Sequence, residues 1–169
     1  ARLFERVQEL SNYDELTKLP VRRYFNEKFA EEIYRSKRFD LTMCLIIMDI
    51  DWFKQINDGY GHQIGDWALK EVSRVIRTSL RQTDVPCRFG GDEFYLMGIG
   101  FTSEESVSII TRIQKYLEHY NGNGSKPYRI TASGGYALTS VYTEDALTDT
   151  FKEADQKMYE QKRLRHQEN

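Results

Sequence analysis

One apolar run limits the possible folds more than any other feature of the chain. It reads "LTMCLIIMDID" at residues 41–51 and contains almost no polar residue before its acidic end. The run is too short to cross a membrane, which takes roughly 18 apolar residues. Its length and its β-branched content predict a strand that is buried on both faces. With 169 residues, the chain is long enough for one domain with a sizeable core around such a strand.

Apolar residues at helical spacing predict helices on either side of this strand. The expected ranges are 22–38, 65–84, 102–120 and 144–163, with a short helix at 52–58. Thr102 or Ser103 is expected to cap the helix at 102–120, and Asp51 is expected to cap the short helix. At the N-terminus, Leu3, Val7 and Leu10 form one apolar seam. That segment is either a fraying helix or the end of a coiled coil that joins an upstream domain.

Two further apolar runs flank a Gly-Gly pair, "VPCRF" at 85–89 and "EFYLMGI" at 93–99. They predict a hairpin in which glycine supplies the positive φ of a primed turn. Residues 128–138, "YRITASGGYAL", predict a last strand with a Gly-Gly break. The order is therefore βαββαβ, an α+β fold whose antiparallel sheet carries its helices mainly on one face. Such a sheet brings the end of the first strand, at Asp49, close to Asp92 in the hairpin.

Composition excludes several classes of function. The formal net charge of −2 gives no general attraction to nucleic acid or to a membrane surface. Cys44 and Cys87 lie in apolar runs, which favours buried thiols in a reducing compartment, the cytoplasm. We see no signal peptide and no membrane-spanning run. The chain does not begin with Met, so we expect a longer protein, with an upstream region that could carry a membrane anchor.

The acidic residues carry the candidate chemistry. Asp49 directly follows the apolar run, and a carboxylate there needs a partner because unpaired burial is costly. Asp92 can serve only if a cation lies between the two. Carboxylates and a backbone carbonyl around one hard cation, with phosphates completing the shell, are typical of Mg²⁺. Gly90 and Gly91 would let a phosphate approach the backbone. The alternative, an ordinary Gly-Gly-Asp turn without function, is equally consistent with these residues alone.

Five ordered motifs then give a resemblance. They are "YDELTKLPVRR" at 13–23, "MDIDWFKQINDGYGHQIGDWAL" at 48–69, "GGDEF" at 90–94, "ASGGYA" at 132–137 and "EADQKMYEQK" at 153–162. Together they resemble the GGDEF domain family, the diguanylate cyclases, over residues 11–167, although Val21 stands where the family usually has Asn. The resemblance implies a palm-like fold related to nucleotidyl cyclases and polymerases. It assigns residues 13–169 to this domain and 1–12 to the end of an upstream linker or signalling helix.

The implied activity is the condensation of two GTP molecules into cyclic di-GMP with release of pyrophosphate. By resemblance, Asp49, the Ile50 carbonyl and Asp92 hold Mg²⁺ or Mn²⁺, two ions per active site, and Asp92 or Glu93 activates the ribose 3′-hydroxyl. Contacts to GTP are assigned to Phe53, Lys54, Asn57, His62, Asp66 and Lys162. Asn57 and Asp66 would read the guanine edge, where N1–H and N2–H₂ are both donors. The lysines would meet phosphates as point charges, whereas a surface lysine is ordinarily only a solvated cation.

Two features concern affinity and regulation. The family ends this block with Lys, two residues and Gly-Arg-Asn, but here Arg165 replaces the glycine and His166 the arginine that would touch the terminal phosphate. Arg163 or Arg165 is the candidate to compensate. "RQTD" at 81–84 matches the family's inhibitory motif, in which Arg81 and Asp84 would bind the product; the alternative is a plain helix C-terminus.

The implied partners are GTP, cyclic di-GMP, a second copy of the domain and an upstream sensor or regulatory domain. Two other interpretations remain. One is a non-catalytic module that binds GTP or cyclic di-GMP as a receptor, although such modules usually have altered signature acids and this chain retains Asp49, Asp92 and Glu93. The other is a cyclase with relaxed base choice, which the presence of Asp66 opposes.

Overall fold

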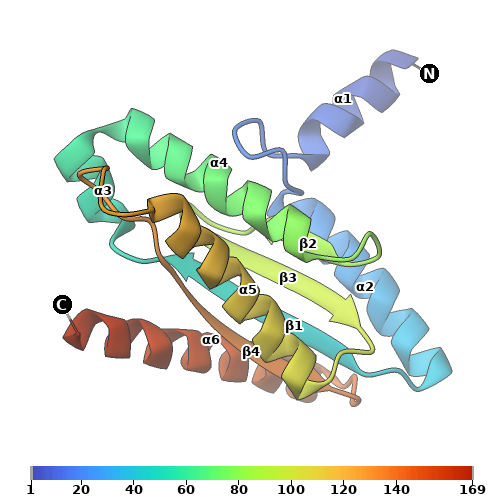
Figure 1. Cartoon of the computed structure of the whole chain (residues 1–169). Coiled ribbons are helices and arrows are strands. Elements are labelled where there is room, and N and C mark those ends of the chain that lie inside the picture. The colour runs from blue at the N-terminus through green and yellow to red at the C-terminus, as the bar shows by residue number, and fades with distance from the viewer. Residues whose placement is uncertain (1, 169) are drawn as a thin grey trace.

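The computed structural model describes residues 2–168 and contains six helices and four strands in that range (Figure 1). The helices are α1 (Arg2–Asn12), α2 (Arg22–Phe39), α3 (Phe53–Tyr60), α4 (His62–Ser79), α5 (Ser103–Asn121) and α6 (Glu144–Gln167). The strands are β1 (Met43–Ile50), β2 (Val85–Arg88), β3 (Glu93–Ile99) and β4 (Ala132–Thr139). Every predicted element is present, and the boundaries differ by a few residues.

The four strands form one antiparallel sheet in the order β2-β3-β1-β4. The apolar strand β1 is therefore central, between β3 and β4, as its composition predicts. Leaving aside α1, α2, the short α3 and the C-terminal α6, the chain order is βαββαβ, which confirms the α+β palm-like fold.

Helices cover both faces of the sheet, so the expectation that they lie mainly on one face is wrong. On one face, Ile46 and Met48 of β1 belong to a core formed with α4 and α5. On the other face, Leu45 and Ile47 belong to a second core, which includes Phe25 of α2. The cause is in the strand itself. Successive side chains point to opposite faces of the sheet, and β1 is apolar at both its odd and its even positions. Helices must therefore bury both faces.

The two Gly-Gly pairs do not act as the sequence predicted. The glycines with positive φ among the described residues are Gly61, Gly100, Gly122 and Gly124. The hairpin pair, Gly90 and Gly91, is absent from this set, and the link between β2 and β3 spans residues 89–92, so no primed two-residue turn forms.

The second pair does not break β4, which is continuous. A Cβ atom at Gly135 would lie 2.2 Å from the Met158 backbone nitrogen. This glycine therefore allows α6 to pack closely on the sheet.

The helix ends follow local chemistry in one case and not in another. Thr102 caps α5 in a capping box with Glu105, which confirms the first of the two predicted caps. The residue before α3 is Trp52, which makes no side-chain cap hydrogen bond, so the predicted cap by Asp51 is wrong.

The predicted N-terminal helix is present as α1, which extends away from the sheet (Figure 1). Leu3, Phe4 and Val7 are exposed on it, while the side chain of Leu10 lies outside the described residues. A coiled coil here stays a prediction. None of the helices in the described range is both long and apolar enough to span a membrane.

Candidate active site

The site lies where β1 and β3 meet the hairpin. Asp49 pairs with Glu93 across the two strands, and the Ile50 N–H donates a 3.1 Å hydrogen bond to the Asp92 carbonyl. The structure therefore brings together the three acidic residues that the sequence singled out. The register fixes the backbones of Asp49 and Glu93, and the bond from Ile50 holds Asp92 of the hairpin link at the same end of the sheet.

Asp49 is the most perturbed of these acids. Lys162 of α6 donates a 2.9 Å hydrogen bond to its Oδ2 atom, while Oδ1 is buried with no partner among the described residues. Burial and the adjacent Asp92 raise the pKa of Asp49 to about 7, although Lys162 opposes the shift. A buried, partnerless carboxylate oxygen beside a second carboxylate fits a hard cation, which would satisfy both.

The acid set is sparse for a resident metal. Within residues 2–168, no three His, Cys, Asp or Glu side chains gather as a metal cluster. Two carboxylates and the Ile50 carbonyl would leave several positions to water or to substrate phosphates, as Mg²⁺ prefers.

Glu93 lies at the same end of the sheet as Asp49, but its pKa is shifted by a different set of neighbours. Burial, and then the negative charges of Asp155 and Asp92, raise the pKa of Glu93, while Tyr95 and Arg22 oppose the rise. An elevated pKa makes a carboxylate a better proton acceptor near neutral pH. Because Asp92 and Glu93 are adjacent in the chain, their positions alone do not decide which of the two is the proton acceptor.

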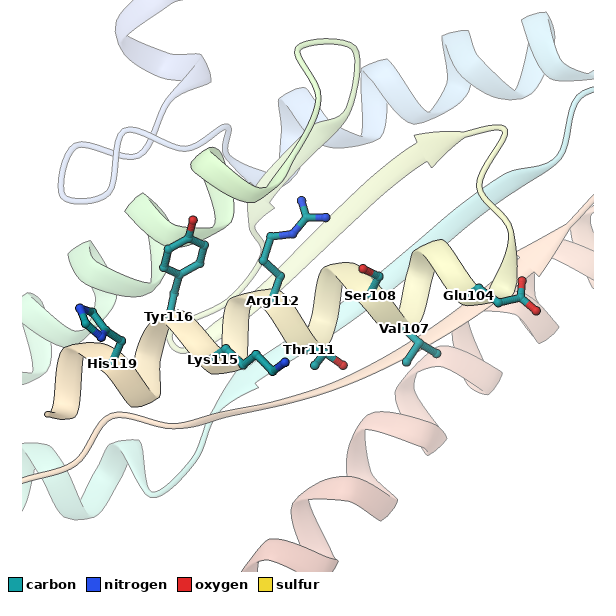
Figure 2. A pocket seen from close by; sticks show the side chains of 8 residues that line it. All are labelled: Glu104, Val107, Ser108, Thr111, Arg112, Lys115, Tyr116 and His119. Atoms are coloured by element: carbon teal, nitrogen blue, oxygen red, sulfur yellow. The ribbon is translucent and has the colours of Figure 1, made fainter. Parts of the chain in front are cut away.

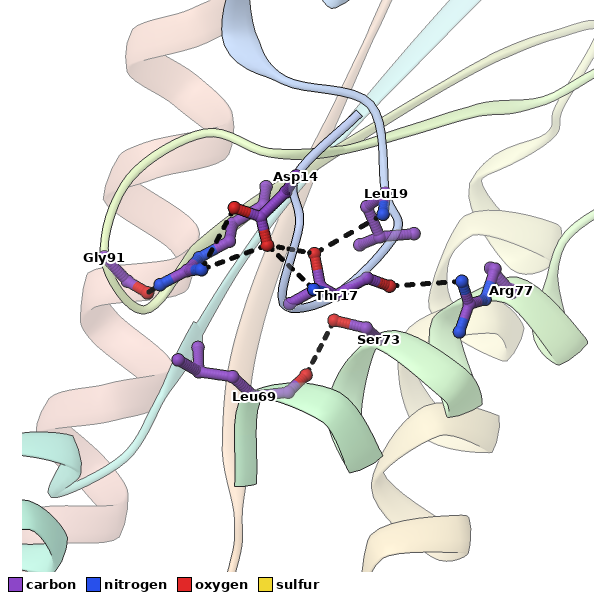
Figure 3. Close-up of polar contacts among 8 residues, drawn as sticks. Asp14, Thr17, Leu19, Leu69, Ser73, Arg77 and Gly91 are labelled. Atoms are coloured by element: carbon purple, nitrogen blue, oxygen red, sulfur yellow. Dashed lines mark hydrogen bonds and ion pairs between the residues drawn. The ribbon is translucent and has the colours of Figure 1, made fainter. Parts of the chain in front are cut away.

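Arg88 fixes the hairpin, a role that the sequence reasoning missed. Its guanidinium donates to the Gly91 carbonyl at 2.9 Å and to Asp14 at 3.1 Å (Figure 3). Thr17 also donates to Asp14, through its backbone N–H at 2.8 Å and its hydroxyl at 2.7 Å. The motif at 13–23 thus supports the turn that carries Asp92. The available signal was an arginine two residues before the glycines, together with an acidic residue in an upstream motif.

The proposed guanine-reading residues lie at the α3–α4 junction. The Asn57 side chain packs so closely on Gly65 that a Cβ atom there would lie 1.8 Å from Asn57 Oδ1. Asn57 is half-buried next to the residue that precedes Asp66, while Asp66 and His62 are exposed at the start of α4. Glycine at position 65 therefore brings the amide close to the helix that carries Asp66. Phe53 and Lys54 lie in the first turn of α3.

Asp51 is a structural anchor. It is only 1% exposed and accepts hydrogen bonds from Thr131 Oγ1 at 2.8 Å and Ser133 Oγ at 2.6 Å. These bonds join the end of β1 to β4. They explain why Asp51 is not available to cap α3.

The end of α6 supplies the basic side of the site. Lys162 pairs with Asp49, and Arg165 lies 3.7 Å from Asp51, whereas Arg163 is exposed. His166 stacks on Trp52 with ring centroids 3.8 Å apart and a 20° angle between planes. Of the two candidates to compensate for the missing family arginine, Arg165 therefore lies beside the site and Arg163 does not.

Arg81 and Asp84 form an internal pair. The Asp84 carboxylate is 2% exposed and accepts from the Arg81 backbone N–H at 2.8 Å and from its guanidinium at 3.2 Å. Arg81 also lies over the Phe101 ring, 4.1 Å from the centroid, and remains half-exposed. Helix α4 ends at Ser79 with Leu80 as its C-cap, so Arg81 directly follows the helix end and both interpretations of this motif stay open. Asp84 thus positions Arg81 and offers little surface of its own.

A separate hollow of about 890 Å³ lies along α5 and contains none of these residues (Figure 2). Its lining consists of Glu104, Val107, Ser108, Thr111, Arg112, Lys115, Tyr116 and His119. All come from one helix, so it is an open surface rather than an enclosing nucleotide site.

Fold and site together define a palm-like α+β domain with carboxylates at one end of its two central strands, β1 and β3. The family model for "Diguanylate cyclase, GGDEF domain" matches residues 11–168. The chain belongs to the GGDEF domain family.

Known relatives agree with this assignment. The chain is 35% identical over 154 residues to diguanylate cyclase DgcP of Pseudomonas aeruginosa, covering 89% of this chain and 22% of DgcP. It is 32% identical over 161 residues to diguanylate cyclase A of Treponema denticola, covering 91% and 42%. The chain thus spans less than half of either relative.

A solved structure of the coiled coil and GGDEF domain of DgcB from Caulobacter crescentus, in complex with c-di-GMP, superposes with a TM-score of 0.87. It is 25% identical, and the match covers 96% of this chain and 86% of that one. Diguanylate cyclase SiaD of Pseudomonas aeruginosa, solved with its activator SiaC, gives a TM-score of 0.81 at 30% identity, covering 96% and 62%.

Proposed function

We propose that this domain is a diguanylate cyclase that condenses two GTP molecules into cyclic di-GMP and two pyrophosphates. The observation that carries the proposal is the intact acid set where β1 and β3 meet the hairpin, with one buried Asp49 oxygen that has no partner among the described residues. A domain that only binds nucleotide has no need of this costly arrangement. Family membership and the diguanylate cyclases among its relatives support the same conclusion.

Asp49, Asp92 and the Ile50 carbonyl would hold divalent cations. When bound, the cations would neutralise phosphate charge and favour ionisation of the attacking hydroxyl. Asp92 or Glu93 would accept the proton of the ribose 3′-hydroxyl. The 3′-oxygen forms a bond to the α-phosphorus of the other GTP, the bond from that phosphorus to the bridging oxygen breaks, and pyrophosphate leaves with the electron pair. Lys162, which pairs with Asp49, would exchange that contact for a phosphate oxygen.

Asn57 and Asp66 would select guanine by accepting from its N1–H and N2–H₂ groups. Each domain carries one set of these residues, while the product joins two nucleotides. Catalysis therefore requires two domains, each presenting one GTP to the other across a two-fold axis. In this proposal α1 continues into an upstream linker that brings the two domains together.

The test is incubation of the purified domain with GTP and Mg²⁺, with the products identified by mass. Cyclic di-GMP and pyrophosphate are the expected products, and omission of the metal should abolish both. Binding of GTP without turnover, under conditions that allow dimers, would instead identify a receptor module.

A further inference from the structure

A cleft of about 480 Å³ lies between α3 and the segment that joins α5 to β4, two parts of the chain that run side by side (Figure 1). It is lined by Trp52, Gln55, Ile56, Gly59, Tyr60, Pro127, Tyr128 and Arg129. None of these residues is assigned to GTP, since Asn57 of the same helix packs against Gly65 of α4 instead. The volume lies within the range of small-ligand sites.

The two walls of the cleft are joined to each other and to the core. The Tyr60 hydroxyl donates a 2.6 Å hydrogen bond to the Pro127 carbonyl, which ties α3 to the opposite wall. The Tyr60 and Tyr128 rings lie 5.7 Å apart with 57° between their planes. Ile56 is only 4% exposed and belongs to the core that contains α4 and α5. Contacts within the domain therefore hold the cleft in shape without a ligand.

Three aromatic residues, Trp52, Tyr60 and Tyr128, line the cleft. His166 stacks on one face of Trp52, and within residues 2–168 no second ring stacks on this indole. Trp52 is 37% exposed and Tyr60 is 45% exposed. Aromatic rings on two facing walls favour a flat aromatic ligand, because stacked and edge-to-face contacts add to the burial of apolar area.

One cation completes the lining. Arg129 is exposed, and in the part of the chain that the structure describes its guanidinium has no hydrogen-bond or ion-pair partner. No acidic residue lines the cleft among the residues described. Glu118 and Glu168 share a second hollow with Arg129 on the side of α6, yet neither forms an ion pair with it there. Because a guanidinium fork matches the geometry of a carboxylate, the charge of the cleft suits that anion.

We propose that this cleft binds a small aromatic carboxylate, whose flat ring system lies against the aromatic walls and whose carboxylate pairs with Arg129. The ligand is additional to those of the proposed function, and its binding does not depend on turnover of GTP. Pro127, Tyr128 and Arg129 lie in none of the sequence motifs, so only the folded chain brings them opposite α3.

The test is an NMR titration of the isotope-labelled domain with sodium naphthoate, read at the indole N–H signals. The chain has two tryptophans, and Trp67 on α4, outside the cleft, is the internal control. The Trp52 signal should shift with a dissociation constant on the order of 1 mM, the level expected for a ligand of this size. Sodium cyclohexanecarboxylate, which has the same charge and no aromatic ring, should bind roughly threefold to tenfold more weakly.

Gly59→Leu fills the cleft and is the most informative variant. A Cβ atom at Gly59 meets nothing within 4 Å, and leucine favours a helix more than glycine does, so the domain should fold. The leucine side chain occupies the space of the ligand and should weaken naphthoate binding by about tenfold or more. Asp58→Leu, an exposed neighbour on the same helix that does not line the cleft, is the matched control and should bind naphthoate like the parent.

Arg129→Ala tests the charged contact separately. It should weaken naphthoate binding roughly threefold to tenfold, the lower part of the range for a charged hydrogen bond because the side chain is exposed. Binding of naphthamide, the neutral analogue, should not change. If Gly59→Leu proves unstable, this pair of ligands still decides the question, since an undiminished preference for naphthoate over naphthamide in Arg129→Ala would overturn the proposal.

Parental naphthoate affinity in Gly59→Leu would also overturn it, as would equal affinities of the parent for naphthoate and cyclohexanecarboxylate. A Trp67 shift as large as that of Trp52 would show binding outside the cleft and would refute this site. The titrations need no turnover, so the two proposals fail independently. A domain that makes no cyclic di-GMP but binds naphthoate in the cleft would refute only the proposed function, and a domain that makes cyclic di-GMP without binding naphthoate would refute only this site.

Discussion

Lys162 Nζ lies 2.9 Å from Asp49 Oδ2, although the two residues are separated by 113 positions in the chain. This ion pair joins the last helix to the end of the central strand, at the point where a cation is proposed to bind. It satisfies only one of the two Asp49 oxygens, because Oδ1 is buried without a partner among the described residues. The pair therefore stabilises the acid site without completing it.

The first prediction concerns stability and pH. Burial and Asp92 raise the pKa of Asp49 to about 7 in the folded domain, above about 3.9 in an unfolded chain. Between these values the folded state binds more protons, so this residue lowers the free energy of unfolding as pH rises from about 4 to about 7. Asp49→Asn should therefore raise the Tm of the metal-free domain near pH 8 and change it little near pH 4.

The measurement is thermal unfolding in EDTA and again with Mg²⁺. Mg²⁺ should raise the Tm of the parent by binding the folded state, and should raise that of Asp49→Asn less. A lower Tm for Asp49→Asn in EDTA near pH 8 would show that the Lys162 pair outweighs the cost of burial.

The second prediction is that Asp92→Ala reduces turnover of GTP on the order of 10²-fold or more, comparable to the loss of one electrostatic stabiliser. The hydrogen bond from Ile50 is made to the backbone carbonyl of residue 92, so the hairpin should persist. Initial rates with Mg²⁺ and with Mn²⁺ test this, with Asp149→Ala on α6 as an exposed control. Near-parental turnover by Asp92→Ala would remove it from the metal site.

The third prediction is that Asp66→Ser weakens the preference for GTP over ATP. An acceptor that pairs two guanine donors discriminates strongly, because adenine leaves it without a partner. The ratio of kcat/KM for the two nucleotides is its own control, since a general loss of activity cancels. An unchanged ratio would exclude Asp66 from base reading.

The fourth prediction is that Arg81→Ala weakens binding of cyclic di-GMP by about tenfold to a hundredfold, the range for a charge-assisted hydrogen bond. Because Asp84 is buried and already bonded to Arg81, we expect the arginine to make the ligand contact. Calorimetric titration and full progress curves measure the effect, and initial rates should barely change. Arg74→Ala, an exposed arginine paired on α4, is the control. Parental affinity in Arg81→Ala would leave this motif without a regulatory role.

The fifth prediction is that specific activity rises with the concentration of the domain. Two domains must face each other, and α1 offers only a short exposed apolar seam that includes Leu3 and Val7. The dimer should therefore be weak. Specific activity that stays constant across about a hundredfold dilution would indicate a preformed tight dimer or another mechanism.

Local sequence patterns were enough to predict the helices and strands and their order in the chain. The apolar run of β1, the helical spacing and the capping box at Thr102 are local signals, so residues close in the chain settle them. The predicted strand order also brought the end of the first strand, at Asp49, close to the hairpin that carries Asp92, while the register that sets Asp49 opposite Glu93 came from the structure.

The contacts that hold these acids in place could be seen only in the folded domain. The bond from Arg88 to Asp14, the pair of Lys162 with Asp49, and the anchoring of Asp51 by Thr131 and Ser133 each join distant parts of the chain. No local pattern specifies such contacts, because a charged side chain is equally compatible with a solvated surface. For the same reason, the local pattern predicted a helix cap at Asp51, whereas the structure shows a buried anchor. Its partners lie 80 and 82 residues away, Thr131 directly before β4 and Ser133 in it, and a buried carboxylate is stabilised where donors converge.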